Sequence, residues 1–235
     1  MPTIPIEVSA RHCHLSQKDL DILFGKGYKL TPIKDLSQRE QYAAKEVLEV
    51  QTPSSWGLPP HFDFTFGKAP DHNQMRILGP VREHTQVELS WSDCLSAGIE
   101  PRVLVSGDLE QSAGGLILVG PQGEVKLNRE IIVPQRHIHC GSDRARELGL
   151  KHGQIVSVRV INTLLLTKEG PGEVSSLPYE GGAGGGLSKA FPIRSITFHN
   201  VIIRTHPTFD WQMHLDTDEG NAAGIKMMGM GEVIV

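Results

Sequence analysis

The 235-residue sequence has few of the features that mark several common protein classes. It contains three cysteines, an odd number that argues against a disulfide framework and for a reducing compartment. Basic residues do not dominate, because the net charge is -4 with histidines neutral. No apolar run approaches the roughly 18 residues of a membrane span, and the N-terminus lacks the pattern of a secretory signal. We therefore expect a cytoplasmic protein that binds neither nucleic acid nor membranes.

Long helical patterns are also scarce, whereas short β-rich segments are frequent. Residues 47–52, 115–120, 155–161 and 196–206 are examples, and glycine or proline separates many such segments. Many short strands are best satisfied by small closed barrels, which leave no long open edges. The sequence predicts a mainly β fold of two β-barrel domains capped by short α-helices, with a boundary near Pro134. The predicted domains are residues 1–134 and 135–235.

Three segments carry the start and stop signals of short helices. Residues 16–25 have Ser16 as the expected N-cap and glycine as the stop signal. Residues 90–99 repeat this pattern with Ser90 or Ser92 as the cap, and residues 140–150 repeat it with Ser142. Two other segments, residues 52–75 and 167–191, are rich in proline or glycine and are predicted to be loops inserted between strands; the second of these carries the glycine-rich insertion of the second domain.

The motif Arg-His-x-His occurs twice, at residues 11–14 and 136–139. Side chains two apart on a strand project from the same face, so each motif directs two imidazoles to one place. A single pair is common on exposed strands, but two pairs in repeated surroundings favour metal binding. Cys13 and Cys140 are expected to point away from the histidines and to pack in the core.

Further ligands must come from elsewhere in the chain. Two segments offer them, and the candidates are His84, Glu88, His206, Asp210, His214, Asp216, Asp218 and Glu219. The acidic residues from 216 to 219 suit either a hard cation or the N-terminus of a helix, and capping is the favoured role. His214, between two apolar residues, is the better zinc candidate of this segment.

Several ordered blocks resemble a known family. They include VSARHCHLSQKDLDILFGKGYKL, RILGPVREHTQVELSWSD, IIVPQRHIHCGSDRARELGLKHGQIVSVRV and MHLDTDEGNAAGI. These blocks resemble phosphotransacylases of the PduL type, also called phosphate propanoyltransferases, over nearly the whole chain except the two insertions. The resemblance implies two β-barrel domains with the active site and two zinc ions (Zn²⁺) between them. It also implies reversible transfer of an acyl group, propanoyl or acetyl, between coenzyme A and phosphate.

The resemblance also assigns the site residues. It implies that His12, His14 and Glu88 bind one zinc ion and that His137, His139 and His214 bind the other, with His206 as the alternative to His214. It assigns phosphate binding and a catalytic role to Arg82, and Ser106 is expected to lie near the substrate. Phosphate would attack the thioester directly, without a covalent acyl-enzyme.

Two other functions remain open from the sequence. A dinuclear hydrolase of acyl-coenzyme A or phosphoesters would use the same metal ligands, and a non-enzymatic barrel module would hold zinc only for structure. Family members in bacterial microcompartments carry an amphipathic N-terminal extension, whereas ten residues precede Arg11 here. Targeting to a microcompartment by that route is therefore not expected. Association with a shell or with further copies of the chain stays open.

Overall fold

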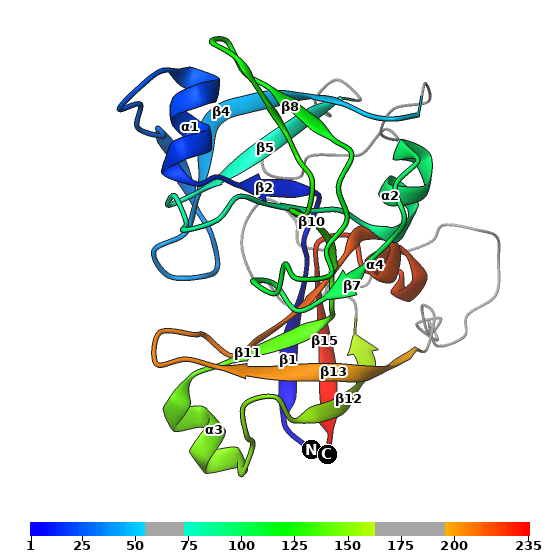
Figure 1. The fold of residues 1–235 in the computed structure, drawn as a ribbon. Coiled ribbons are helices and arrows are strands. Elements are labelled where there is room, and N and C mark those ends of the chain that lie inside the picture. The colour runs from blue at the N-terminus through cyan, green and yellow to red at the C-terminus, as the bar shows by residue number, and fades with distance from the viewer. Residues whose placement is uncertain (55–72, 163–195) are drawn as a thin grey trace, which may run out of the picture.

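The computed structural model describes residues 1–54, 73–162 and 196–235 (Figure 1). Most of the first expected insertion, including His61 and His72, and the whole of the second insertion lie outside the described residues. The described part is mainly β, with four short helices, as predicted. One sheet is a closed barrel and the other is a curled half-barrel.

Six strands form the closed barrel, in the order β1, β14, β11, β13, β12, β15. They occupy the lower half of Figure 1. The chain positions are β1 (Thr3–Val8), β11 (His137–Cys140), β12 (Ile155–Asn162), β13 (Thr197–Thr205), β14 (Gln212–Leu215) and β15 (Met228–Ile234). Closure leaves no strand of this sheet with an unpaired edge, which suits a set of short strands.

Nine strands form the second sheet, in the order β7, β10, β6, β2, β5, β4, β8, β9, with β3 paired to β4. Their positions are β2 (His12–His14), β3 (Pro32–Asp35), β4 (Tyr42–Gln51), β5 (Gln74–Gly79), β6 (Gln86–Glu88), β7 (Val103–Leu104), β8 (Ile117–Val119), β9 (Glu124–Lys126) and β10 (Ile131–Pro134). Each sheet encloses its own apolar core. Cys13 lies in one core and Cys140 in the other, both fully buried, so the packing role predicted for these cysteines is confirmed.

The two sheets exchange strands. β1 precedes β2 in the chain but pairs with β14 and β15 of the closed barrel. In the same way β10 precedes β11 but pairs with β6 and β7 of the other sheet. The sheets therefore do not divide at residue 134, because the first strand lies in the barrel built from the C-terminal half. The division into domains at residues 1–134 and 135–235 stays a prediction.

The helices are α1 (Gln17–Phe24), α2 (Trp91–Ala97), α3 (Ser142–Leu148) and α4 (Thr217–Ala223). Ser16, Ser90 and Asp216 cap three of them through side-chain oxygens, so the capping role predicted for Ser16 and for the acidic segment is confirmed. The prediction of Ser142 as a cap was wrong. Strand β11 runs to Cys140, so Gly141 is the flanking residue of α3 and Ser142 already belongs to the helix. Among the described residues, no helix has the length and apolar character needed to cross a bilayer.

Candidate active site

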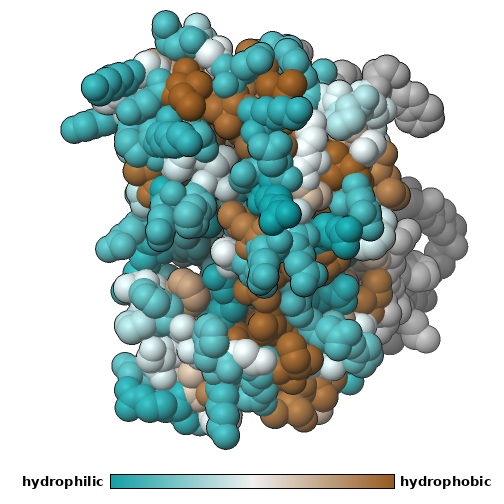
Figure 2. All heavy atoms as spheres, in the orientation of Figure 1, coloured by the Kyte–Doolittle hydropathy of each residue, from teal (hydrophilic) through white to brown (hydrophobic). Residues whose placement is uncertain are grey.

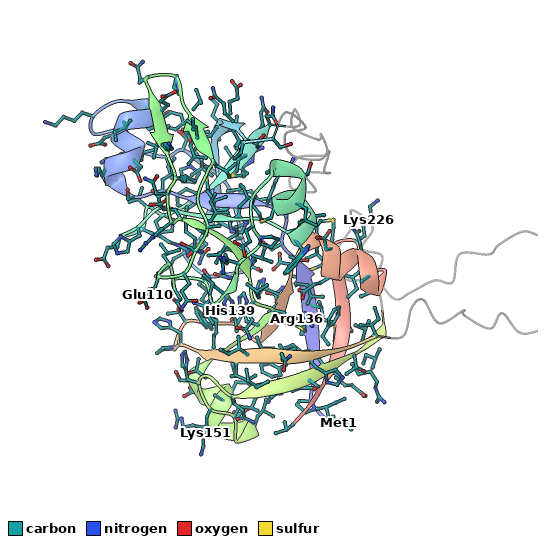
Figure 3. The ribbon with its side chains drawn as sticks, turned by 45° about the vertical axis from the view of Figure 1, so that its right-hand side comes forward. Met1, Glu110, Arg136, His139, Lys151 and Lys226 are labelled. Atoms are coloured by element: carbon teal, nitrogen blue, oxygen red, sulfur yellow. The ribbon has the colours of Figure 1, made fainter. Side chains whose placement is uncertain are left out.

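The two histidine pairs lie on the short strands β2 and β11, where the chain passes from one sheet to the other. All four imidazoles are buried, with at most 8% of each residue exposed. The intervening Cys13 and Ile138 face the two cores, as strand alternation requires. His139 and Arg136 accordingly lie close to the junction of the two halves in Figure 3. The strand exchange thus brings both motifs to one region.

The first cluster consists of His12, His14 and Glu88. Strand β6 runs antiparallel to β2 with Glu88 opposite His12, so the third donor comes from a neighbouring strand. The Nε2 atom of His12 lies 3.5 Å from Oε2 of Glu88. One donor atom from each residue lies within 4.8 Å of the other two. Two imidazoles and a carboxylate at this spacing can hold a divalent metal ion with a position left open.

The second cluster consists of His137, His139 and His214. Strand β14 runs antiparallel to β11 with His214 opposite His137. The centroids of the three rings are 4.7 to 5.3 Å apart. His206, the alternative third ligand, is exposed and its Nδ1 lies 2.9 Å from Oγ1 of Thr208. The structure therefore brings His214, and not His206, to the second pair.

Backbone carbonyl groups orient three of the five imidazoles. The Nδ1 atom of His12 lies 2.8 Å from the backbone oxygen of Ala10. The Nδ1 atom of His14 lies 3.2 Å from the backbone oxygen of Leu78, and that of His137 lies 2.9 Å from the backbone oxygen of Gln135. A ring that donates to a carbonyl from Nδ1 keeps the lone pair of Nε2 for a ligand. In His214 the Nε2 atom is buried and has no hydrogen-bond partner among the described residues. In the first cluster these orientations fit metal binding through Nε2, and among the described residues it is this cluster that brings its donor atoms within 4.8 Å of one another.

Burial favours the neutral form of His14, His137, His139 and His214. It lowers the pKa of His14, His139 and His214 well below the usual range, and neighbouring imidazoles and arginines lower them further. Burial and Arg204 lower the pKa of His137 to about 4. Burial raises the pKa of Glu88, but His12, the hydroxyl of Ser106, His137 and Arg82 together outweigh this effect and leave it below its usual value. Neutral imidazoles and an ionised carboxylate are the protonation states that bind metals.

Both clusters line one cavity of about 470 Å³. Arg82, from the sheet side, and Arg204, from the barrel side, line it as well. Neither guanidinium has a carboxylate in direct contact among the described residues, and Arg204 donates to the backbone oxygen of Ser106 at 3.3 Å. Figure 2 shows an indentation between the two halves, bordered mostly by hydrophilic residues on this face. Two arginines that form no direct ion pair in the described part of the chain suit a polyanionic ligand.

Ser106 lies beside the first cluster. Its hydroxyl donates to Oε1 of Glu88 at 2.9 Å and accepts from Nε2 of Gln86 at 2.8 Å. Gln86 also donates to Glu88 at 2.6 Å. The serine therefore holds the carboxylate in place, in addition to lining the cavity.

The arginines of the two motifs anchor helices. Arg11 forms a buried ion pair with Asp93 at 2.8 Å, and Arg136 pairs with Glu219 at 2.6 Å. Each carboxylate is also the N3 residue of a capping box, in α2 or α4. Both helices begin shortly after a third donor, Glu88 or His214. The repeated arginine thus ties each histidine pair to the segment that supplies its third donor.

Two site features were missed from the sequence. Arg204 ends an apolar stretch of β13 and lies opposite His139 in the register of β11 and β13. Glu7 lies on β1 opposite His214. A charged residue at the end of an apolar strand was the available signal for Arg204. Glu7 reaches the site because β1 pairs with strands of the C-terminal half, and no pattern in the nearby sequence indicates this pairing.

Comparisons with known proteins point to one family. The profile of the family described as phosphate propanoyltransferase matches residues 5–58, 64–168 and 189–226. The phosphate propanoyltransferase of Thermotoga maritima is 36% identical over 99% of this chain and 88% of its own length. That of Sebaldella termitidis is 35% identical over 97% and 86%, and that of Listeria monocytogenes 32% identical over 98% and 87%.

Fold, site and relatives together define the chain as an enzyme of the phosphate acyltransferase class. Within that class, it belongs to the phosphate propanoyltransferase family. Coenzyme A fits this family as a substrate.

Proposed function

We propose that the chain interconverts acyl-coenzyme A plus phosphate with acyl phosphate plus coenzyme A at a site for two zinc ions. One ion is assigned to His12, His14 and Glu88, and the other to His137, His139 and His214. The observation that supports this most is the single cavity lined by both clusters and by two arginines. When bound, the metal ions supply positive charge that stabilises the oxyanion and the thiolate formed in the reaction.

The donor set supports zinc. Imidazole nitrogen and carboxylate oxygen are the usual ligands of catalytic zinc, and three protein ligands leave a position for substrate. The buried Nε2 of His214, which has no hydrogen-bond partner within the described ranges, supports a ligand at the second cluster. No cysteine lies at either cluster, because Cys13, Cys94 and Cys140 lie in the two apolar cores and not in the cavity lining. A site of this kind is more typical of catalysis than of a closed structural zinc.

The arginines act on phosphate. Arg82 holds the dianion through its planar fork, and Arg204 faces it from the other side of the cavity. An oxygen of the bound phosphate forms a bond to the carbonyl carbon of the thioester, and the carbon–sulfur bond then breaks to release the coenzyme A thiolate. No side chain needs to be acylated. Ser106 orients Glu88 through its hydroxyl and contributes to the substrate-facing wall.

Short acyl groups, propanoyl or acetyl, are the proposed substrates. The cavity of about 470 Å³ is at the small end of ligand sites, and it must also admit phosphate and the thiol end of coenzyme A. The three relatives described above carry the name phosphate propanoyltransferase. A cytoplasmic location belongs to the same proposal, and so does the absence of nucleic-acid partners.

The test measures release of the coenzyme A thiol from propanoyl- and acetyl-coenzyme A, with and without phosphate and before and after chelation. We expect release that saturates with phosphate, that stops on chelation and that returns with zinc. Metal analysis of the same preparation should give about two ions per chain. Thiol release that is equally fast without phosphate would instead support a dinuclear hydrolase. Phosphate-dependent release that survives complete removal of metal would refute the zinc site.

A further inference from the structure

Strands β1 and β10 hold equivalent places in the two sheets, because each runs parallel to the strand that supplies the third donor. On β10, Ile132 lies opposite Glu88. On β1, Glu7 lies opposite His214. The two clusters therefore differ in a complementary way. In the first cluster the carboxylate, Glu88, is itself one of the three donors. In the second cluster the carboxylate, Glu7, lies on the strand next to the one that supplies the third donor.

The carboxylate of Glu7 is held toward the second cluster. Its Oε2 atom lies 3.8 Å from Nδ1 of His214. The same oxygen accepts hydrogen bonds from Oγ of Ser37 at 2.5 Å and from Nε2 of Gln212 at 2.9 Å. The side chain is 29% exposed and lines the cavity. The hydrogen bonds from Ser37 and Gln212 thus hold the carboxylate of Glu7 in a position that faces Nδ1 of His214.

His214 needs such a partner. His12, His14 and His137 each place Nδ1 against a backbone carbonyl, which fixes the tautomer. For His214, the carboxylate of Glu7 lies near Nδ1, while Nε2 is buried and makes no hydrogen bond to any residue that the structure describes. At 3.8 Å the interaction is longer than a direct hydrogen bond and is mainly electrostatic. A negative charge on this side favours the tautomer with the proton on Nδ1 and the lone pair on Nε2.

We propose that Glu7 is a positioning residue that fixes the tautomer and ring orientation of His214 and supplies negative charge to the all-histidine cluster. This inference rests on the two-metal site of the proposed function. Three neutral imidazoles leave the charge of a divalent ion uncompensated, whereas Glu88 compensates it directly in the first cluster. A carboxylate behind a ligating histidine increases the basicity of the ring and strengthens its bond to the metal. Glu7 therefore raises the metal affinity of the second cluster selectively.

The alternative role for Glu7 is to hold the loop that contains Ser37. Both roles involve the same carboxylate, but only the first one changes metal binding. Ser37→Ala removes the loop contact but keeps the hydrogen bond from Gln212, which still holds Glu7 beside His214, so this variant separates the two roles. Glu232 provides a matched control in the same barrel, because its side chain is 27% exposed and pairs with Arg159 on the strand beside it.

The experiment compares the wild type with Glu7→Gln, Ser37→Ala and Glu232→Gln. Zinc(II) is titrated against a competing chelator, and the visible spectrum is recorded after loading with cobalt(II). We expect Glu7→Gln to weaken the binding of one of the two zinc ions about 10- to 100-fold and to alter the cobalt spectrum. The affinity for the other zinc ion should stay the same. The two control variants should bind both ions as the wild type does.

Two zinc ions bound by Glu7→Gln with wild-type affinity and an unchanged cobalt spectrum would overturn the inference. An equal loss in Ser37→Ala would also overturn it, because the loop would then account for the effect. If Glu7→Gln does not fold, Glu7→Asp withdraws the carboxylate by one methylene, and unchanged binding of the second ion in that variant would count against the inference. A wild type that binds fewer than two ions would contradict the proposed function itself.

Discussion

The ion pair between Arg11 and Asp93 gives a prediction whose size follows from burial. The side chain of Arg11 is 1% exposed and that of Asp93 is 6% exposed. Replacement of Arg11 by methionine leaves the carboxylate buried without its counter-ion, a change that costs about 3–5 kcal/mol of unfolding free energy. For a chain of this size, each kcal/mol lowers the melting temperature by about 2–4 °C, so the expected decrease is about 6–20 °C.

Two other arginines of the same protein calibrate this prediction. Arg136 and Glu219 are 34% and 16% exposed, so we expect Arg136→Met to lose roughly 1–2 kcal/mol. Arg102 and Glu100 are 46% and 73% exposed, and Arg102→Met should change the stability by less than about 0.5 kcal/mol. Urea unfolding followed by circular dichroism measures all three, in chelator, so that bound metal does not shift the equilibrium.

The order of the three losses tests the reasoning more strictly than any single value. In addition, Asp93→Asn in the Arg11→Met background should recover part of the loss, because no charge is then left buried. A urea midpoint of Arg11→Met equal to that of Arg102→Met would show that burial does not determine how much the Arg11–Asp93 pair contributes to the unfolding free energy.

Three further predictions concern the active site. His12→Ala and His137→Ala should each lower the bound metal from about two ions to about one and reduce turnover more than a hundredfold, and elemental analysis showing full metal in both variants would contradict the ligand assignment. Arg82→Lys keeps the charge but loses the fork, so the KM for phosphate should rise about tenfold while the KM for acyl-coenzyme A stays the same, as initial rates will show. Folding lowers the pKa of His137 from 6.5 to about 4. In the metal-free protein, the stability that the neutral ring provides is therefore complete above about pH 6.5 and is lost as the pH falls through about 4. A urea midpoint that stays constant over this pH range would argue against the burial of the ring.

The sequence predicted those parts of the structure that depend on near neighbours in the chain. Period-two alternation directs His12 and His14 to one face and Cys13 to the other, and this follows from backbone geometry alone. The caps Ser16 and Asp216 satisfy amide groups two or three residues away, so their chemistry is also local. The one failed cap, Ser142, shows the limit. Its place depends on how far β11 extends, and pairing with β13 and β14 determines that length.

By itself, the sequence determined which donor types this protein has, their pairing on short strands and the mainly β class of the fold. Only the tertiary structure decided which distant residues meet those donors. The meeting of His214 with the second histidine pair, and the presence of Arg204 and Glu7 at the site, depend on the register between strands that are far apart in the chain. Register results from burial and hydrogen bonding across whole sheets, and here also from the exchange of β1 and β10, so no local pattern encodes it.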